Sequence, residues 1–98
     1  MLRGRPKKKR IIKQQPRISF FSPRGKPGRP DEVCIGMDEF ETVRLYDFLG
    51  QSQKEAAKSM NISQQTFSRI LKQAHRALAD VLINGKIIRI AKPANPTE

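Results

Sequence analysis

The sequence has little of the chemistry on which most enzymes and secreted proteins depend. Its 98 residues include one cysteine, one histidine, one tyrosine and no tryptophan. The single cysteine, Cys34, excludes an internal disulfide, and with His75 alone it forms no cluster of soft metal ligands. No apolar run approaches the roughly 20 residues of a membrane span, and none follows the charged N-terminus as in a signal peptide. We therefore expect no enzyme, metal, cofactor or membrane span; Cys34 should pack as a small apolar residue and His75 should lie partly exposed on a helix.

Acidic residues are absent from the first 30 positions, which carry eleven of the twenty Lys and Arg residues. The other nine basic residues balance all nine acids, so the net charge of +11 lies in the first third of the chain. A block of like charge does not pack against itself, and this predicts a disordered basic arm. About 60 residues remain for one small domain, which buries only ~60% of its unfolded surface. A homodimer is therefore left open.

The composition and the spacing of apolar residues predict that the rest of the chain is a mainly α-helical domain with short flanking β segments. Strand-like residues occur at 17–21 and at 86–90, and the sequence leaves open whether these segments pair within one chain or between two. The full division is a disordered basic arm over 1–16, a short strand and a loop rich in proline and glycine over 17–36, a three-helix domain with a C-terminal strand over 37–90, and a flexible tail over 91–98.

The first helix of this domain is predicted from its two ends. Asp38 followed by Glu41 has the spacing of a capping box, in which each side chain accepts a backbone N–H at the start of a helix. Gly50 is the expected stop, because glycine takes the left-handed cap conformation at little cost.

Two further helices follow, separated by a tight turn. Ser52 and Glu55 predict a second capping box, Asn61 suits a turn position with positive φ, and Ser63 caps the third helix, which Gly85 closes. The third helix, 64–83, has an apolar stripe at helical spacing. Its members are Phe67, Ile70, Leu71, Ala74, Leu78, Val81 and Leu82.

A short helix, a tight turn and a longer helix together describe a helix-turn-helix, although a purely structural helical hairpin is the alternative. Ala57 is small where the helices must cross, and Ile62 suits the buried turn position. In DNA-binding proteins the first residues of the second helix of this motif reach base edges in the major groove. The candidate base contacts are Ser63, Gln64, Gln65, Thr66, Ser68 and Arg69.

Other residues of the two helices are candidates for contacts with DNA phosphates. Gln65, Arg69, Lys72 and Arg76 fall on one face of the third helix, opposite its apolar stripe and with no acid among them. The start of the second helix offers free backbone N–H groups to an anion. The candidate phosphate contacts are Ser52, Gln53, Lys54, Lys72 and Arg76.

The basic arm carries a second nucleic-acid pattern. Arg3-Gly4-Arg5-Pro6 resembles the core of an AT-hook, whose arginines enter a narrow minor groove of A·T base pairs. A generic phosphate-binding arm is the alternative. The basic residues of the arm are Arg3, Arg5, Lys7, Lys8, Lys9 and Arg10.

Several segments together resemble a small prokaryotic family, the uncharacterised protein family 0251, also called domain of unknown function 134. The resemblance covers nearly the whole chain, and it implies a DNA-binding helix-turn-helix similar to sigma factor region 4, within the winged-helix-like proteins. Some members have an extra C-terminal domain, for which 98 residues are too short. The segments that carry the resemblance are residues 37–47, Gly50, 53–57, Met60, 63–71, Gly85-Lys86 and Arg89-Ile90.

The sequence departs from this family at three positions. Gln51 stands where the family has an apolar residue, and Leu49 stands where it is often polar, so we expect the two to exchange roles at the corner before the second helix. Gln64 replaces an arginine, which favours adenine as the contacted base.

These observations predict a cytoplasmic, nucleoid-associated protein that binds double-stranded DNA and regulates transcription. Helix 64–83 would read the major groove, and the basic arm would bind phosphates or the minor groove. Two alternatives remain: an RNA-binding or ribosome-associated basic protein, and a protein-interaction module that docks on the transcription machinery. An exposed apolar patch on the third helix would favour the last of these.

Overall fold

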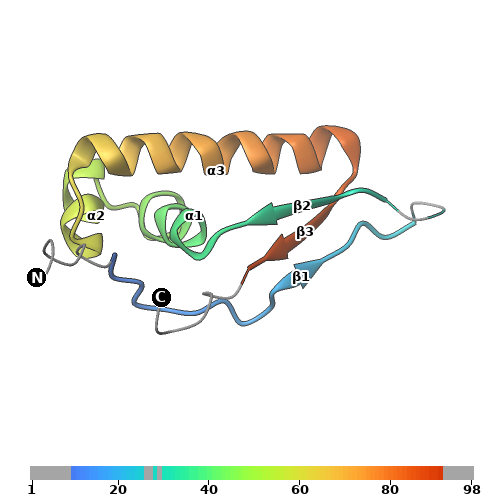
Figure 1. Ribbon diagram of the computed structural model, residues 1–98, viewed down its shortest axis with the longest axis horizontal. Helices are drawn as coiled ribbons and strands as arrows, with labels where there is room; N and C mark the ends of the chain where they lie inside the picture. The colour runs from blue at the N-terminus through green and yellow to red at the C-terminus, as the bar shows by residue number, and fades with distance from the viewer. Residues whose placement is uncertain (1–9, 26–27, 29, 92–98) are drawn as a thin grey trace, which may run out of the picture.

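The computed structural model describes residues 10–25, 28 and 30–91, and about half of these residues are helical. A long helix lies along one side of the molecule, with the shorter helices and a small sheet beneath it (Figure 1). None of the helices in these residues is long and apolar enough to cross a bilayer. The elements in chain order are β1 (Phe20–Phe21), β2 (Glu32–Ile35), α1 (Met37–Thr42), its π-helical continuation η1 (Val43–Phe48), α2 (Gln53–Met60), α3 (Gln64–Asn84) and β3 (Ile87–Ile90).

The two strand-like segments pair within the chain, in a three-stranded sheet of order β1-β3-β2. The central strand, β3, runs antiparallel to β1, with Phe20 opposite Arg89. It runs parallel to β2, with Val33 opposite Ile88. Parallel strands need a long crossover connection, which the three helices supply here. The two partners of β3 are thus β1, which precedes the loop that contains Gly28, and β2, which follows it.

The first helix begins before its predicted cap. Gly36 is the cap residue, and its N–H donates to the Glu39 carboxylate at 2.9 Å. Asp38 accepts instead from the neighbouring Glu39 N–H at 2.8 Å. The predicted capping box of Asp38 and Glu41 is wrong, because Glu41 points into the protein, where it is fully buried and bound by Arg44.

The second half of this helix widens into a π-helix and ends at Gly50 as predicted. The Leu49 N–H donates to the Arg44 carbonyl, five residues back, at 2.9 Å. Gly50 has a φ of 77°. The expected exchange of roles at this corner does not occur, since Leu49 is half-exposed and Gln51 is only half-buried. The side-chain oxygen of Gln51 is buried without a hydrogen-bond partner among the described residues.

The ends of α2 and α3 confirm the predicted caps. Ser52 Oγ accepts from the Glu55 N–H at 3.1 Å, and Glu55 Oε1 accepts from the Ser52 N–H at 3.2 Å. Asn61 has a φ of 59°, the left-handed conformation expected for the turn. Ser63 Oγ accepts from the amide three residues later at 3.1 Å, and Gly85 ends α3 with a φ of 64°.

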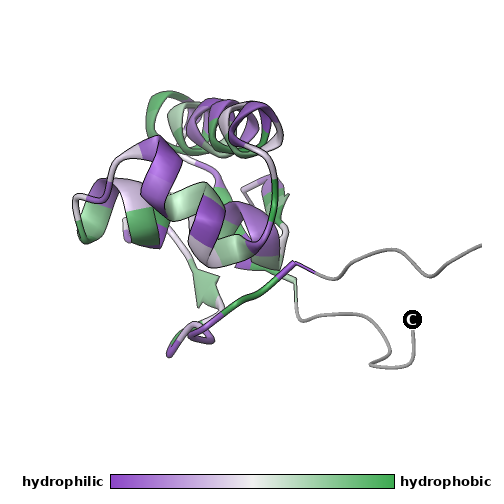
Figure 2. Ribbon diagram, turned by 90° about the vertical axis from the view of Figure 1, so that its left-hand side faces the viewer, coloured by the Kyte–Doolittle hydropathy of each residue, from purple (hydrophilic) through white to green (hydrophobic). Residues whose placement is uncertain are grey.

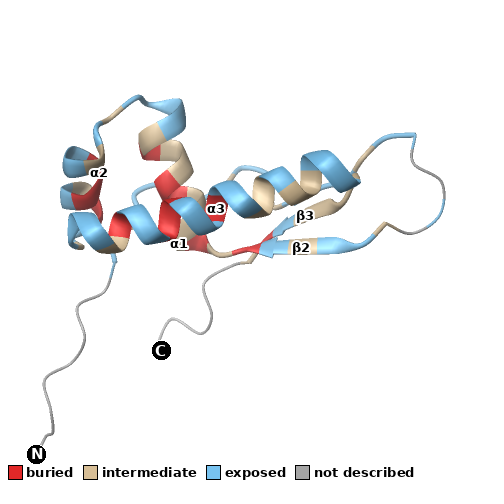
Figure 3. Ribbon diagram, turned by 90° about the horizontal axis from the view of Figure 1, so that it is seen from above, coloured by how far each residue is buried: buried red, intermediate tan, exposed pale blue. Residues whose placement is uncertain are grey.

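The core lies beneath the first half of α3, where α2 and η1 meet it (Figure 3). Ala56 and Ala57 are buried there, and their small side chains let α2 approach α3 closely, as predicted for Ala57. The central cluster consists of Leu45, Ala56, Ala57, Met60, Phe67 and Leu71, with Ile62 packed partly buried against it.

Two apolar residues predicted to be buried are exposed. Leu82 is 82% exposed, because the last turns of α3 extend beyond the main core and no described element covers that side. Cys34 is exposed on β2, where burial alternates along the strand and Ile35 takes the inward position. The spacing of apolar residues in a helix or strand therefore does not show whether another element covers each of them.

Candidate nucleic-acid interface

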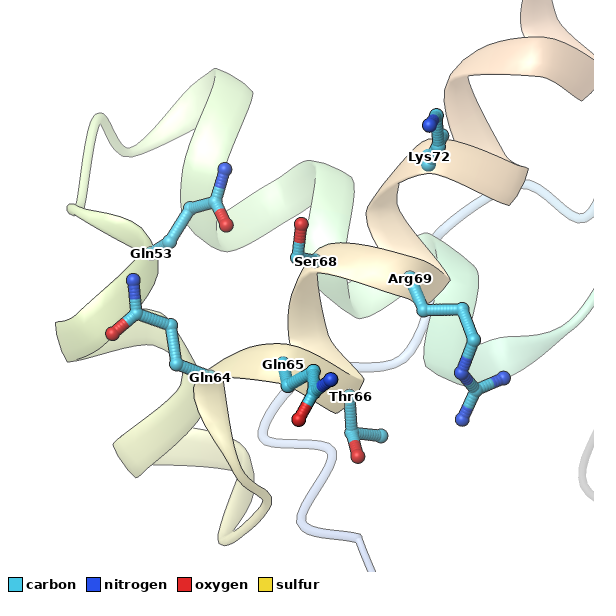
Figure 4. Close-up of a pocket in the computed structure, with 7 residues that line it drawn as sticks. All are labelled: Gln53, Gln64, Gln65, Thr66, Ser68, Arg69 and Lys72. Carbon is cyan, nitrogen blue, oxygen red and sulfur yellow. The ribbon is translucent and has the colours of Figure 1, made fainter.

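A polar hollow of about 710 Å³ opens where the first turns of α2 and α3 lie against each other. Figure 4 shows the side chains of α3 standing around this space, with Gln53 reaching across from α2. Gln53 and Thr66 are half-buried, whereas the other members are exposed. The lining residues are Gln53, Gln64, Gln65, Thr66, Ser68, Arg69 and Lys72.

The packing between α2 and α3 holds the two walls of the hollow in place. Met60 and Phe67 are fully buried between the helices. The turn is closed by the Ile62 N–H, which donates to the Ala57 carbonyl at 3.1 Å, and by the left-handed backbone of Asn61. Each wall begins at a capped helix end, formed by Ser52 for α2 and by Ser63 for α3.

The outer face of α3 is basic, and its charges have no ion-pair partner in the part of the chain that the structure describes. Gln65, Arg69, Lys72 and Arg76 are all exposed, as the sequence predicted. None of the three cations forms an ion pair with a described residue. The sequence of α3 contains no acid before Asp80. An unpaired, exposed row of cations has its full charge available to an anionic partner.

The structure brings together most of the predicted base contacts. Five of the six line the hollow, but Ser63 does not. The Ser63 hydroxyl donates to Thr66 Oγ1 at 2.9 Å while its oxygen accepts the Thr66 N–H, so capping occupies both of its hydrogen-bonding functions. Ser63 is therefore better described as the residue that shapes the start of α3.

The predicted phosphate contacts divide into three places. Gln53 and Lys72 line the hollow. Ser52 and Lys54 are exposed at the start of α2, outside the set of lining residues. Arg76 lies one turn beyond Lys72 and lines a second hollow, together with Gln73, Asp80 and Val33 of β2. The sequence did not single out Gln53 from its neighbours, because only the packing of α2 on α3 decides which side of the first turn of α2 faces the hollow.

The N-terminal segment approaches the domain beside the α2–α3 turn. The Ile11 N–H donates to the Met60 carbonyl at 3.0 Å, and the Lys13 N–H donates to Glu41 Oε2 at 3.0 Å. Arg10 lies 3.5 Å from Asp38. Residues 10–16, expected within the disordered arm, are thus held against the domain because they supply donors for buried acceptors. The other arm residues, Arg3, Arg5, Lys7, Lys8 and Lys9, lie outside the described residues.

Figure 2 looks onto this end of the molecule, where hydrophilic and apolar segments alternate along the helices. One pair was not foreseen from the sequence: His75 Nε2 of α3 lies 2.7 Å from Asp47 Oδ2 of η1. Both side chains are about half-exposed, so His75 is partly exposed as predicted but has an acidic neighbour. The two residues are 28 positions apart in the sequence, so no local pattern indicates this contact.

A separate apolar surface lies between the segment before β2 and the α1–η1 helix. Phe21, Phe40 and Val43 line two adjoining hollows there, and the 81% exposed Phe48 stands at the rim of one of them. Arg17 is a further lining residue and forms no ion pair with a described residue. This surface shares no residue with the polar hollow.

Comparison with known proteins places the chain among proteins of unknown function. A family model described as "Protein of unknown function DUF134" matches residues 1–94. A UPF0251 protein of Prosthecochloris aestuarii is 47% identical over 88 residues, which cover 89% of this chain and 57% of that protein. A UPF0251 protein of Methanococcus vannielii is 44% identical over 89 residues, 90% of this chain and 68% of its own. The chain thus spans between about half and two thirds of the length of these relatives, and no solved structure matches it.

Proposed function

This chain belongs to the DUF134 family of proteins of unknown function, and we propose that it is a DNA-binding protein that regulates transcription. The observation that carries the proposal is the polar hollow, in which amide and hydroxyl side chains from α2 and α3 stand beside a row of unpaired cations. Such a surface offers hydrogen bonds to base edges and positive charge to the phosphates on either side.

In this proposal α2, the Asn61 turn and α3 act as a helix-turn-helix. The start of α3 enters the major groove, where Gln64, Gln65 and Arg69 contact base edges. Lys72 and Arg76, further along α3, meet the phosphate backbone. Ser52 and Lys54 approach the backbone from the start of α2, assisted by the helix N-terminal N–H groups.

The basic arm adds affinity that does not depend on sequence. The Ile11 N–H is bonded to the Met60 carbonyl at the end of α2. In the proposal, the residues before it reach the duplex that the start of α3 contacts. Arg3 and Arg5 enter the minor groove or bind phosphates there. The protein then resides on the nucleoid, and two copies on a symmetric site would space their α3 helices about one turn of DNA apart.

RNA fits this surface less well than DNA. The major groove of an A-form helix is deep and narrow, so side chains at the start of α3 do not reach its base edges. A protein-interaction module is the second candidate, and the exposed apolar residues favour it: Leu82 and Ile83 at the end of α3, and Phe48 beside the apolar hollows. The two functions use different faces, and one protein can have both.

The proposal is tested by selecting bound duplexes from a random DNA library with the full chain, with a random RNA library in parallel. We expect an enriched DNA motif, which is flattened in a variant with Gln65→Ala and Arg69→Ala while the helical content is kept. No enriched DNA sequence, together with tight RNA binding, would support the RNA alternative instead.

The arm is tested separately by removing residues 1–9, which leaves the contacts of Ile11 and Lys13 intact. Five cations are lost, so the slope of log affinity against log salt should become shallower by up to about 4 to 5. Fluorescence anisotropy over a range of salt concentrations measures this slope. An unchanged slope would reject a role for the arm in binding.

A further inference from the structure

The sequence grouped Gln53 with Ser52 and Lys54 as a phosphate contact, but in the structure it lies beside residues of α3. It is the first residue of α2, and it lines the polar hollow together with Gln64 and Ser68 of α3 (Figure 4). Ser52 and Lys54, on either side of it in the chain, do not line the hollow. Gln53 is also half-buried, whereas Lys54 is exposed.

The chemistry of Gln53 suits a base edge better than a phosphate. A phosphate offers only acceptors, for which Lys54 is the stronger partner, and half of the glutamine amide has no use there. Adenine presents an N7 acceptor and an N6 donor in the major groove, and a glutamine amide supplies the matching donor and acceptor. The hollow has three such amides, from Gln53, Gln64 and Gln65, and one guanidinium, from Arg69.

We propose that the hollow selects duplex DNA in which adenines adjoin a guanine, and that Gln53 is a third base-reading amide beside Gln64 and Gln65. Arg69 pairs with O6 and N7 of the guanine. This inference rests on the proposed DNA-binding function and specifies its target. It moves Gln53 from the residues that position the protein on the backbone to those that determine its sequence preference.

The test compares motifs selected from a random duplex library by the full chain and by three variants: Gln53→Ala, Gln53→Glu and Lys54→Ala. The wild type should enrich adenines next to a guanine. Gln53→Ala should reduce the preference at one adenine by about tenfold or more and leave the other positions unchanged. Gln53→Glu should change that position from adenine to cytosine, because a carboxylate accepts from cytosine N4.

Lys54→Ala is the matched control, because Lys54 is the next residue of α2 but is exposed and lies outside the hollow. It should weaken binding to all sequences alike and make the salt slope shallower by about 1, without changing the motif. The substitutions at residue 53 leave the cap formed by Ser52 and Glu55 in place, and circular dichroism checks that each variant keeps its helices.

The possible results separate this inference from the function on which it rests. A wild-type motif without adenine, or Gln53 variants that weaken all sequences alike, would overturn the inference and leave DNA binding intact. No motif for the wild type would overturn both. A loss confined to one adenine position, with the change to cytosine in Gln53→Glu, would support the assignment.

Discussion

Glu41 offers the sharpest test of the fold, because it is a carboxylate without solvent exposure. Arg44 donates to both of its oxygens, from Nε and Nη2, at 2.9 Å each, and the Lys13 N–H donates at 3.0 Å. The hydrogen bond to Glu41 is the main reason that the pKa of Arg44 is raised. Replacing Glu41 with alanine would leave a largely buried guanidinium and a backbone N–H without acceptors.

Removing one partner of a buried ion pair costs about 3 to 5 kcal/mol. The lower end applies here, since the Arg44 side chain is 16% exposed and can turn toward water. A loss of about 3 kcal/mol is large for a domain of this size, whose total stability is of the order of 4 to 12 kcal/mol. Glu41→Gln keeps the volume and one acceptor, so it should lose less.

Urea unfolding followed by circular dichroism measures these changes. With a slope near 1 to 2 kcal/mol per molar, typical of small proteins, Glu41→Ala should lower the midpoint by about 2 M. Glu32→Ala, which breaks the exposed pair with Arg89, is the control and should hardly move it. A loss below about 1 kcal/mol for Glu41→Ala would mean that water reaches this carboxylate, and the argument from burial would fail.

Three further predictions concern the turn, the cap of α3 and pH. Asn61→Ala should lower the stability by about 1 kcal/mol while Asn61→Gly leaves it nearly unchanged. Glycine has no Cβ to strain at positive φ and asparagine tolerates it through its short polar side chain, whereas alanine has neither advantage; equal losses in urea unfolding would contradict this. Ser63→Ala should cost about 1 kcal/mol without altering the selected DNA motif, since its hydroxyl is occupied by the cap; an altered motif would make Ser63 a base contact. Hydrogen bonds from Asn84 and Lys86 lower the pKa of Asp80, so its stabilisation is present above the ordinary carboxyl pKa and is lost as pH falls through the lowered value. The stability difference between wild type and Asp80→Asn should therefore shrink on acidification, and a difference independent of pH would refute the linkage.

The sequence predicted the parts of the fold that depend on close neighbours in the chain. The caps at Ser52 and Ser63, the left-handed Asn61 and the stop at Gly85 were all found where expected. Each of these features depends on groups within a few residues of one another, so the order of residue types is enough to predict it. The exposed basic face of α3 followed from helical geometry in the same way.

Other predictions failed where the position of a side chain depended on segments far away in the sequence. Glu41 had the spacing of a capping residue, but Arg44 and the Lys13 amide, 28 residues away, hold it in the interior. Leu82 continued the apolar stripe, yet no described element covers it. The spacing of apolar residues identifies which face of a helix is apolar. It does not show along how much of the helix other elements pack against that face.

By itself, then, the sequence determined the three helices, the turns between them and the concentration of net charge in the first third of the chain. The helices and turns follow from backbone capping and apolar periodicity, which act locally. Only the tertiary structure decided the parallel pairing of β2 with β3, the burial of Glu41 and the place of Gln53 in the hollow beside Gln64. Those features exist because segments far apart in the chain pack together, and no short-range pattern records which of them will meet.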